Sequence, residues 1–371
     1  MKVLVAASSF PRSIDDWRSR FILDMVASLA APRGTHDEVS YWGPPGPIPE
    51  GVRDATPAAD ARWLDRLMED GGLAHLLRSS PLAGVRASIG FLLRLRKALR
   101  AERGRQDVLH LNWLQNVLAL PAGPEPVLVT VLGSDFGLLN NPLVRSLVRI
   151  GLARRRCLVA PNAGWMVAPL RDALGGSSEV QAIPFGVSTG WYEVQRKPDH
   201  PRRWLVVARV TRAKIGPLFE WGENIFNGGD ELHLLGPMQD PLKIPGWVHY
   251  HGPTHPEELL QRWFPTAAGL LTLSHHDEGR PQVVLEAMAS AMPVIASRQA
   301  AHEDIIRHGE TGFIVGSPAE LKAAVDEMSE PTHATRVGEA ARAWAAQNIG
   351  TWADTAMRYR AQYQRLLATV P

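Results

Sequence analysis

Two glutamates, Glu278 and Glu286, lie eight positions apart in the segment SHHDEGRPQVVLEAMASAMPVIAS, residues 274–297. The apolar run AGLLTLS that leads into this segment is typical of a buried strand. The residues that follow it would form the loop at the carboxyl end of the strand, and Pro281 would begin a helix, where its missing amide hydrogen costs nothing. One carboxylate would therefore lie in the loop and the other on the first turns of the helix.

The residue types around the two glutamates favour an anionic ligand. The amides of Gln282 and Val283 would point out of the helix start, where they attract negative charge. Gly279 would let a ligand approach the backbone closely, and Arg280 could pair with a charged donor or acceptor. The segment thus predicts a site for a phosphorylated sugar, with a carboxylate on either side for its hydroxyls. In the alternative interpretation, Glu286 only stabilises the helix dipole.

Three adjacent residues, His275, His276 and Asp277, could suggest a metal site. Consecutive loop side chains rarely converge on one ion, and no distant partner motif is visible. The sequence also has no D-x-D pair, no Gly-Lys dipeptide, no G-x-G-x-x-G after a strand and no H-E-x-x-H. We therefore expect no metal requirement and no other cofactor, and the common nucleotide-loop and zinc protease signatures are excluded.

Short apolar runs alternate with helical patterns along most of the chain, which predicts parallel sheets covered by helices on both faces. Segment 186–203 interrupts this alternation with Gly, Pro and charged residues, so we interpret it as a linker between two doubly wound domains. Ligands of such sheets bind at the carboxyl ends of the strands, so the two domains would face a central cleft. The Pro-rich segment 43–60 is expected to be a surface loop.

Bulk composition sets further limits. The 371 residues suffice for two domains, and a net charge of only +2 gives no indication of nucleic acid. The single cysteine, Cys157, excludes an intrachain disulfide and fits a reducing compartment. Because no apolar run reaches the ~18 residues of a membrane span, we expect a cytoplasmic protein. Residues 76–105 carry eight basic residues and one acid among apolar ones, which favours either contact with an anionic membrane or a solvated helix face.

The pattern EGRPQVVLEAMA followed by PVIA resembles the E-x7-E signature of the retaining glycosyltransferases of family four. Further similar segments are VARVTRAKIG, IPFGVSTGWY, WVHYHGPTHPEEL and IIRHGETGFIV, which together cover most of residues 183–330. The resemblance implies the GT-B fold, which consists of two Rossmann-like domains. In this sequence Ala208 and Ile215 replace the glycines that the family usually has beside its conserved arginine and lysine.

The resemblance also implies roles for residues of the second domain. Arg209 and Lys214 would hold the diphosphate of a nucleotide sugar and neutralise it as it leaves, without a metal. Glu286 would bind the ribose hydroxyls and Glu278 the donor sugar, either as a nucleophile or as an electrostatic stabiliser. We favour a front-face transfer with retention, in which the leaving phosphate helps to deprotonate the acceptor. If the resemblance misleads, Arg209 and Lys214 are ordinary surface cations.

The first half of the chain matches the family less well. SSFPRSIDDWRSRF resembles a variant start, F-P-R-x-x-x-D, which suggests Asp16 and Arg18 as acceptor-binding residues, although Asp16 could equally be a capping residue. VTVLGSDF resembles the family's H-G-S-D loop with Leu132 in place of the histidine. This leaves Ser134 as a candidate for binding the acceptor and Asp135 as a candidate catalytic residue.

HLNW, residues 110–113, ends another expected strand. Asn112 is therefore assigned to the acceptor, and His110 joins Asp135 and Glu278 as a candidate catalytic residue. A buried His110 with satisfied hydrogen bonds is the alternative.

These expectations combine into an α/β protein with the GT-B fold. Residues 1–187 would form an acceptor-binding domain, completed by a C-terminal helix at 350–371, and residues 188–349 would form the donor-binding domain. The expected function is retaining transfer of a UDP- or GDP-linked sugar to a saccharide or lipid-linked saccharide in bacterial surface polysaccharide assembly. The protein would work in the cytoplasm or on the cytoplasmic face of the inner membrane. The alternatives are a GT-B epimerase, a pseudo-glycosyltransferase and a non-catalytic sugar-nucleotide binding protein.

Overall fold

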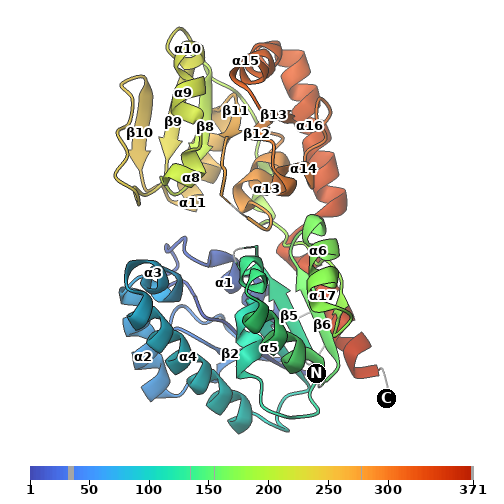
Figure 1. Ribbon diagram of the computed structural model, residues 1–371. Coiled ribbons are helices and arrows are strands. Elements are labelled where there is room, and N and C mark those ends of the chain that lie inside the picture. The colour runs from blue at the N-terminus through green and yellow to red at the C-terminus, as the bar shows by residue number, and fades with distance from the viewer. Residues whose placement is uncertain (32–36, 134, 154, 277, 369–371) are drawn as a thin grey trace. The chain divides into compact units, whose positions relative to one another are not determined.

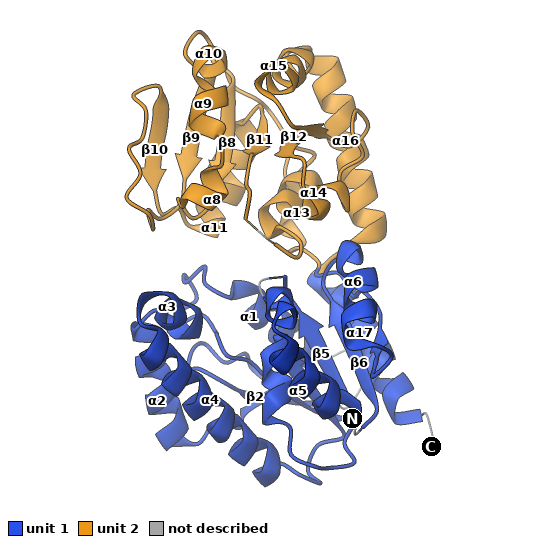
Figure 2. Ribbon diagram, in the orientation of Figure 1, with its two compact units in different colours: residues 1–185, 352–371 blue, residues 186–351 orange. Residues whose placement is uncertain are grey.

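In the computed structural model, the chain folds into two parallel β-sheets, each covered by its own helices (Figure 1). The structure describes residues 1–31, 37–133, 135–153, 155–276 and 278–368. The first unit comprises residues 1–185 and 352–371, and the second comprises residues 186–351 (Figure 2).

The sheet of the first unit has seven parallel strands in the order β3-β2-β1-β4-β5-β6-β7. Three of its central strands, β4, β5 and β6, are buried along their whole length, which accounts for their almost continuous apolar sequences. The strands are β1 (Lys2–Ala6), β2 (Glu38–Trp42), β3 (Val52–Asp54), β4 (Val108–Asn112), β5 (Val127–Val131), β6 (Cys157–Pro161) and β7 (Glu179–Val180).

Helices cover this sheet and build two cores. Side chains of α4 and α5 belong to one core, and side chains of α1 and α17 belong to the other. The helices are α1 (Arg20–Ala30), α2 (Ala58–Glu69), α3 (Gly72–Ser79), α4 (Pro81–Ala101), η1 (Leu114–Ala119), η2 (Phe136–Asn140), α5 (Pro142–Ala153), η3 (Gly164–Met166), α6 (Val167–Leu174) and α17 (Trp352–Ala368). Helix α17 therefore returns from the end of the chain to complete the first unit.

The sheet of the second unit has six parallel strands in the order β10-β9-β8-β11-β12-β13. Its strands are β8 (Arg203–Val207), β9 (Glu231–Leu235), β10 (Val248–Gly252), β11 (Gly269–Thr272), β12 (Val294–Ser297) and β13 (Phe313–Val315). Its helices are α7 (Gly190–Glu193), α8 (Arg212–Ile215), α9 (Leu218–Trp221), α10 (Glu223–Phe226), α11 (Pro256–Glu258), η4 (Leu259–Trp263), α12 (Phe264–Thr266), α13 (Gln282–Ala289), α14 (Ala300–Glu303), α15 (Pro318–Glu327) and α16 (Pro331–Asn348).

Two segments differ from the sequence prediction. Segment 186–203, interpreted above as a linker, belongs to the second unit, where Trp191 and Val194 are buried and the Trp191 ring lies 4.7 Å from that of Phe264. Its Gly and Pro residues are typical of a linker, so the sequence pattern does not indicate this packing. Segment 43–60, expected to be a loop, includes the short strand β3 and the start of α2. None of the described helices is long and apolar enough to cross a membrane.

Candidate functional site

Helix α8 places Lys214 at the carboxyl end of β8. The chain leaves β8 at Val207 and passes Arg209 before the helix begins, and the hydroxyl of Thr211 caps the helix by accepting the Lys214 amide at 3.2 Å. The helix ends at Gly216, whose φ is +55°. A Cβ atom at this position would lie 2.0 Å from the carbonyl oxygen of Leu273, so only glycine lets α8 pack directly on the end of β11.

The loop after β11 is held by hydrogen bonds on both sides. The His275 amide donates to the carbonyl oxygen of Ala213 at 2.7 Å, which fastens the loop to α8. The carbonyl oxygen of Ser274 accepts from the Ser297 hydroxyl at 2.7 Å and from the side-chain amide of Gln299, both at the end of β12. The carboxyl ends of β8, β11 and β12 are thereby joined into one edge of the second unit.

An ion pair between Lys214 and Glu278 lies at this edge. The two side chains are only 15% and 19% exposed, respectively. Burial lowers the pKa of Lys214 and the charge of Arg209 lowers it further, while Glu278 acts in the opposite direction. Arg209 acts electrostatically on Lys214, so both predicted cations lie near Glu278, the carboxylate predicted from the sequence. These three charges form the centre of the candidate site.

Sequence reasoning missed His302, which belongs to α14 after the end of β12. Its side chain is buried, and its Nδ1 donates to the carbonyl oxygen of Ser297 at 2.8 Å. Burial lowers the pKa of His302, and the opposite charges of Glu278 and Lys214 also act on the ring. A search of the loop after every strand would have found this histidine, since β12 ends at the same edge as β11.

The start of α13 differs in detail from the prediction. Pro281 is the residue before the helix, with ψ at 114°, and Gln282 is the first helical residue. The Gln282 side chain donates to the carbonyl oxygen of Gly186 at 2.7 Å. Arg280 pairs with Asp304, and its side chain is only 9% exposed. The side chains of Gln282 and Arg280 are therefore both bonded to other groups of the protein. In this structure Arg280 positions the loop.

Three other residues of the predicted donor set accompany α13. Gly279 is buried in the preceding loop, and Val283 is half-buried, packing against a core of the second unit. Glu286 is half-buried on the second turn of the helix. Their location is compatible with the ligand contacts predicted for the backbone of Gly279 and Val283 and for the carboxylate of Glu286.

In the first unit, His110 is fully buried within the core. Its Nδ1 forms a hydrogen bond of 2.6 Å with the hydroxyl of Tyr363, and its Nε2 forms one of 2.7 Å with the hydroxyl of Thr130. Burial lowers the pKa of His110 to about 3, so the ring is neutral near neutral pH. The structure therefore favours the structural alternative for His110 over the catalytic one.

Asp135 and Asn112 are also buried. The Asp135 carboxylate accepts the amides of Leu114 at 2.8 Å and Leu132 at 2.9 Å, so it joins two loops at the carboxyl ends of β4 and β5. Burial raises the pKa of Asp135, although these hydrogen bonds oppose the shift. The Asn112 side chain donates to the carbonyl oxygen of Ala6 at 3.4 Å. Asp135 thus has a positioning role in this structure.

The remaining acceptor candidates are at the start of the chain and in the loop after β5. Asp16 accepts two hydrogen bonds from the Arg18 guanidinium, at 3.0 and 3.1 Å, and a third from the amide of Arg12 at 3.2 Å. Burial opposes ionisation of Asp16, but its hydrogen bonds to Arg18 keep its pKa below the ordinary value. The two predicted residues therefore bind each other. Ser134 lies outside the described residues.

Comparisons with known proteins agree with this architecture. The family model "Glycosyl transferases group 1" matches residues 224–330. Sucrose-phosphate synthase from Thermosynechococcus elongatus is 16% identical, with a TM-score of 0.70 and 99% of each chain covered. A UDP-forming trehalose-phosphate synthase from Burkholderia xenovorans is 11% identical, with a TM-score of 0.69 and 99% of each chain covered. Anabaena HepE in complex with UDP and glucose is 13% identical, with a TM-score of 0.65, covering 98% of this chain and 100% of HepE.

A search of curated proteins by sequence finds no match. The two parallel α/β units and the structural similarities confirm the expected GT-B fold. The matched range includes Glu278 and Glu286 and supports a glycosyltransferase. Arg209 and Lys214 precede the matched residues, so their assignment depends on the local geometry described above.

Proposed function

We propose that the protein is a retaining glycosyltransferase that takes a sugar from a UDP- or GDP-linked donor without a metal ion on the diphosphate. One observation carries this proposal: Lys214, Glu278 and the charge of Arg209 meet at the carboxyl ends of β8 and β11. Two cations beside a helix start can neutralise a diphosphate as it leaves. The adjacent carboxylate can stabilise positive charge on the sugar.

The residues of the second unit would divide the work of binding the donor. Arg209, Lys214 and the amides at the start of α13 hold the diphosphate, Glu286 binds the ribose hydroxyls, and Glu278 faces the sugar. During transfer, the bond from C1 of the sugar to the diphosphate oxygen breaks, and the acceptor oxygen bonds to C1 on the same face. The acceptor proton passes to the leaving phosphate, so the charges and atoms balance.

The choice of the first donor to test comes from the structural neighbours. HepE binds UDP and glucose, and the trehalose-phosphate synthase from Burkholderia is UDP-forming. Another similar structure, with a TM-score of 0.71, is a trehalose-6-phosphate synthase described in connection with glycosyl transfer with retention. UDP-glucose is therefore the first donor to examine, with GDP-mannose as the comparison.

The first unit would bind a saccharide or lipid-linked acceptor and rest on the cytoplasmic face of an anionic membrane, as in bacterial surface polysaccharide assembly. Helix α4 contains no acid, and its exposed side includes Leu82, Ile89 and Leu93 together with Arg86 and Lys97. Helix α5 shares a core with α4 and exposes further apolar side chains, at Leu143, Leu147 and Ile150. Apolar residues flanked by cations are the composition that binds anionic lipid surfaces.

Calorimetry with sugar nucleotides tests the donor site. Replacing Arg209 or Lys214 by Ala is expected to weaken binding of UDP-glucose, or of the donor that binds best, by about 1.5–3 kcal/mol each, because each change removes a charged hydrogen-bond donor. Lys243→Ala is the matched control, since Lys243 is an exposed lysine of the same unit. Equal affinity in the Lys214→Ala and Lys243→Ala variants would remove the diphosphate assignment. NMR of the anomeric proton in the product tests retention.

A further inference from the structure

The edge of the second sheet carries a cluster of three histidines and a glutamate. Strand β10 is the edge strand, and it pairs in parallel with β9 so that His249 lies opposite His233. Glu231 and His251 lie two residues away from these positions, one on each strand. Because side chains alternate along a strand, Glu231, His233 and His249 project from the same face of the sheet. His251 lies at an irregularity of β10, and its ring contacts with His233 place it on that face as well.

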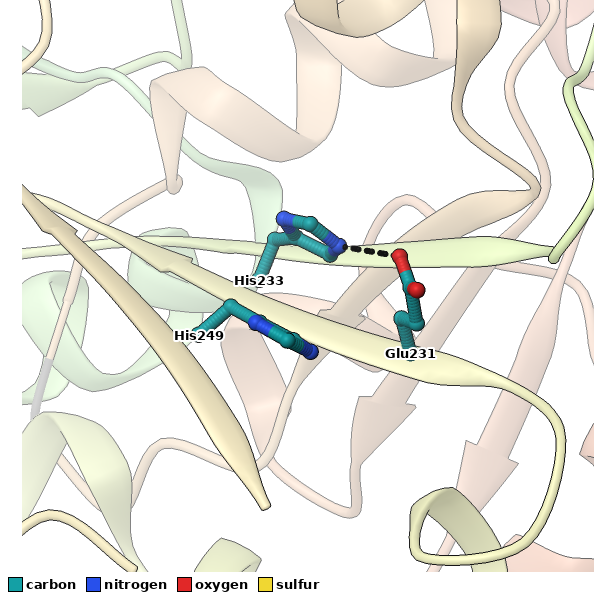
Figure 3. A group of neighbouring side chains, drawn as sticks. All are labelled: Glu231, His233 and His249. Atoms are coloured by element: carbon teal, nitrogen blue, oxygen red, sulfur yellow. Dashed lines mark hydrogen bonds and ion pairs between the residues drawn. The ribbon is translucent and has the colours of Figure 1, made fainter. Parts of the chain in front are cut away.

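The side chains of Glu231, His233 and His249 lie close together (Figure 3). The Nε2 atom of His233 lies 2.9 Å from the Glu231 carboxylate, and its Nδ1 lies 2.9 Å from Nε2 of His251. The His233 ring stacks on the ring of His249 with centroids 4.8 Å apart. One ligand atom from each of Glu231, His233 and His249 lies within 4.8 Å of the other two.

This donor set has the chemistry of a transition-metal site. Two imidazoles and one carboxylate suit zinc, and three protein ligands leave one position for water. At bond lengths of about 2.0–2.2 Å, tetrahedral ligands lie roughly 3.3 Å from one another. The observed 2.9 Å separation between Glu231 and His233 is close to this value, whereas the ligand atom of His249 lies within 4.8 Å of the other two, so the His249 side chain would have to turn towards them to complete the set.

The fourth residue and the surroundings add independent support. A histidine bound to a metal through Nε2 usually donates its Nδ1 hydrogen to a neighbouring acceptor, which fixes the ring. Nε2 of His251 is at that position for His233. Trp263 packs against both rings, with centroids 5.4 Å from His233 and 4.6 Å from His251. Glu231 and His249 also line a surface hollow of about 440 Å³, which gives an ion access to the cluster.

One cation competes for the carboxylate. The Nε of Arg203 lies 3.7 Å from Glu231, and the same guanidinium lies 3.2 Å from the carboxylate of Asp199. Asp199 offers Arg203 a closer partner, so Glu231 can turn to a metal while Arg203 remains paired. Farther out, Arg262 and Glu258 act on His251 with opposite charges.

We propose that Glu231, His233 and His249 bind one zinc ion that fastens the edge strand β10 to β9, with His251 as the positioning residue. Zinc would displace the proton from Nε2 of His233; the hydrogen between Nδ1 of His233 and Nε2 of His251 would then reside on Nδ1, and His251 would take up the displaced proton on its own Nδ1, so that each ring keeps one hydrogen. Glu231 is the first residue of β9, whereas Lys214 and Glu278 lie at the opposite, carboxyl ends of the strands. The zinc site is therefore separate from the donor site and independent of the proposed function.

Titration of the tag-free full chain with zinc chloride in a calorimeter tests this site. We expect one zinc ion per chain, and a melting temperature that rises with zinc because the ion binds the folded state. His249→Ala and Glu231→Gln should each weaken zinc binding by tenfold or more. His251→Gln should weaken it by about 10–100-fold, as the loss of a supporting hydrogen bond does in other metal sites. The chain's one cysteine, Cys157, is buried and does not compete.

His75→Ala is the matched control, because His75 is an exposed histidine of α3 in the first unit. It should bind zinc like the unaltered chain. Because His249 is exposed on an edge strand, its variant should fold, and a circular dichroism spectrum checks this directly. Zinc binding that is equal in the His249→Ala and His75→Ala variants, or absent from the unaltered chain at micromolar zinc, would overturn the proposal.

Discussion

The central pair of the candidate site, Lys214 and Glu278, is neutralised within the protein. Breaking a poorly hydrated pair of this kind leaves an uncompensated charge, so each partner needs a replacement before it can leave the other. A diphosphate can supply the negative charge that Lys214 would lose. Glu278 would then be released towards the sugar, which is where its charge is needed during transfer. Under the proposed function, the pair would therefore couple donor binding to exposure of the carboxylate.

Replacing Glu278 by Gln should separate binding from turnover. The amide keeps the shape and one hydrogen-bond acceptor but cannot stabilise positive charge on the sugar, so turnover should fall about 100-fold or more. Donor affinity should change little, because Lys214 remains available to the diphosphate. Steady-state kinetics and calorimetry measure the two quantities, with Glu310→Gln as a control at an exposed position of the same unit. An unchanged turnover number would contradict the role of Glu278.

His110 makes a prediction about pH. Its pKa is about 3 in the folded chain against an ordinary value of 6.5, so between these limits the unfolded chain binds a proton that the folded chain does not. Proton uptake by the unfolded chain lowers the free energy of unfolding as the pH falls below 6.5, by up to about 1.4 kcal/mol per pH unit. Above pH 6.5 the histidine is neutral in both states, and this loss is absent. His110→Gln does not titrate, so its stability deficit should shrink from pH 7 to pH 5 in urea denaturation. A deficit that is independent of pH would refute this account.

At the scale of elements, the sequence predicted much of the second unit. Alternating apolar runs indicated parallel strands, and the order of the loops brought Lys214 and Glu278 to one edge. Partners distant in sequence could not be predicted in this way. Nothing near Arg280 indicates that Asp304 neutralises it, and nothing near Asp135 shows that it accepts the amide of Leu114. Such residues have the polar character of ligand-binding groups, and only the fold distinguishes the two roles.

The contact between α8 and β11 depends on Gly216. Gly216→Ala should destabilise the second unit, because the added Cβ meets the carbonyl oxygen of Leu273 and because a φ of +55° with a ψ of −138° costs a residue with a Cβ about 1–3 kcal/mol. Helix α8 must then move, so donor affinity should fall as well. Gly104→Ala is the matched control, since Gly104 also has a positive φ of +72° but open space around it. Urea denaturation and calorimetry should give a larger loss for Gly216→Ala, and equal losses would exclude the contact as the cause.

At the scale of the whole molecule, the end of the chain completes the unit in which the chain begins. Tyr359 and Tyr363 of α17 are buried against Thr130 and His110, and Arg360 forms an ion pair with Asp37 at 3.1 Å. The resemblance to a known architecture suggested a returning helix, but not these contacts. The first unit thus encloses a polar cluster on the side of α17, while its other face is covered by α4 and α5.

The exposed side of α4 and α5 predicts how the whole protein distributes between solution and membrane. Leu82 and Leu93 of α4 are 84% and 63% exposed, and each would contribute about 1.5–3 kcal/mol on entering a lipid surface. The chain should therefore sediment with vesicles that contain phosphatidylglycerol, and less with phosphatidylcholine or at high salt. The double variant Leu82→Asp with Leu93→Asp should bind at least tenfold less, whereas Met357→Asp, an equally polar change at an exposed position of α17, should not. Sedimentation that ignores the α4 substitutions would place any membrane contact elsewhere on the molecule.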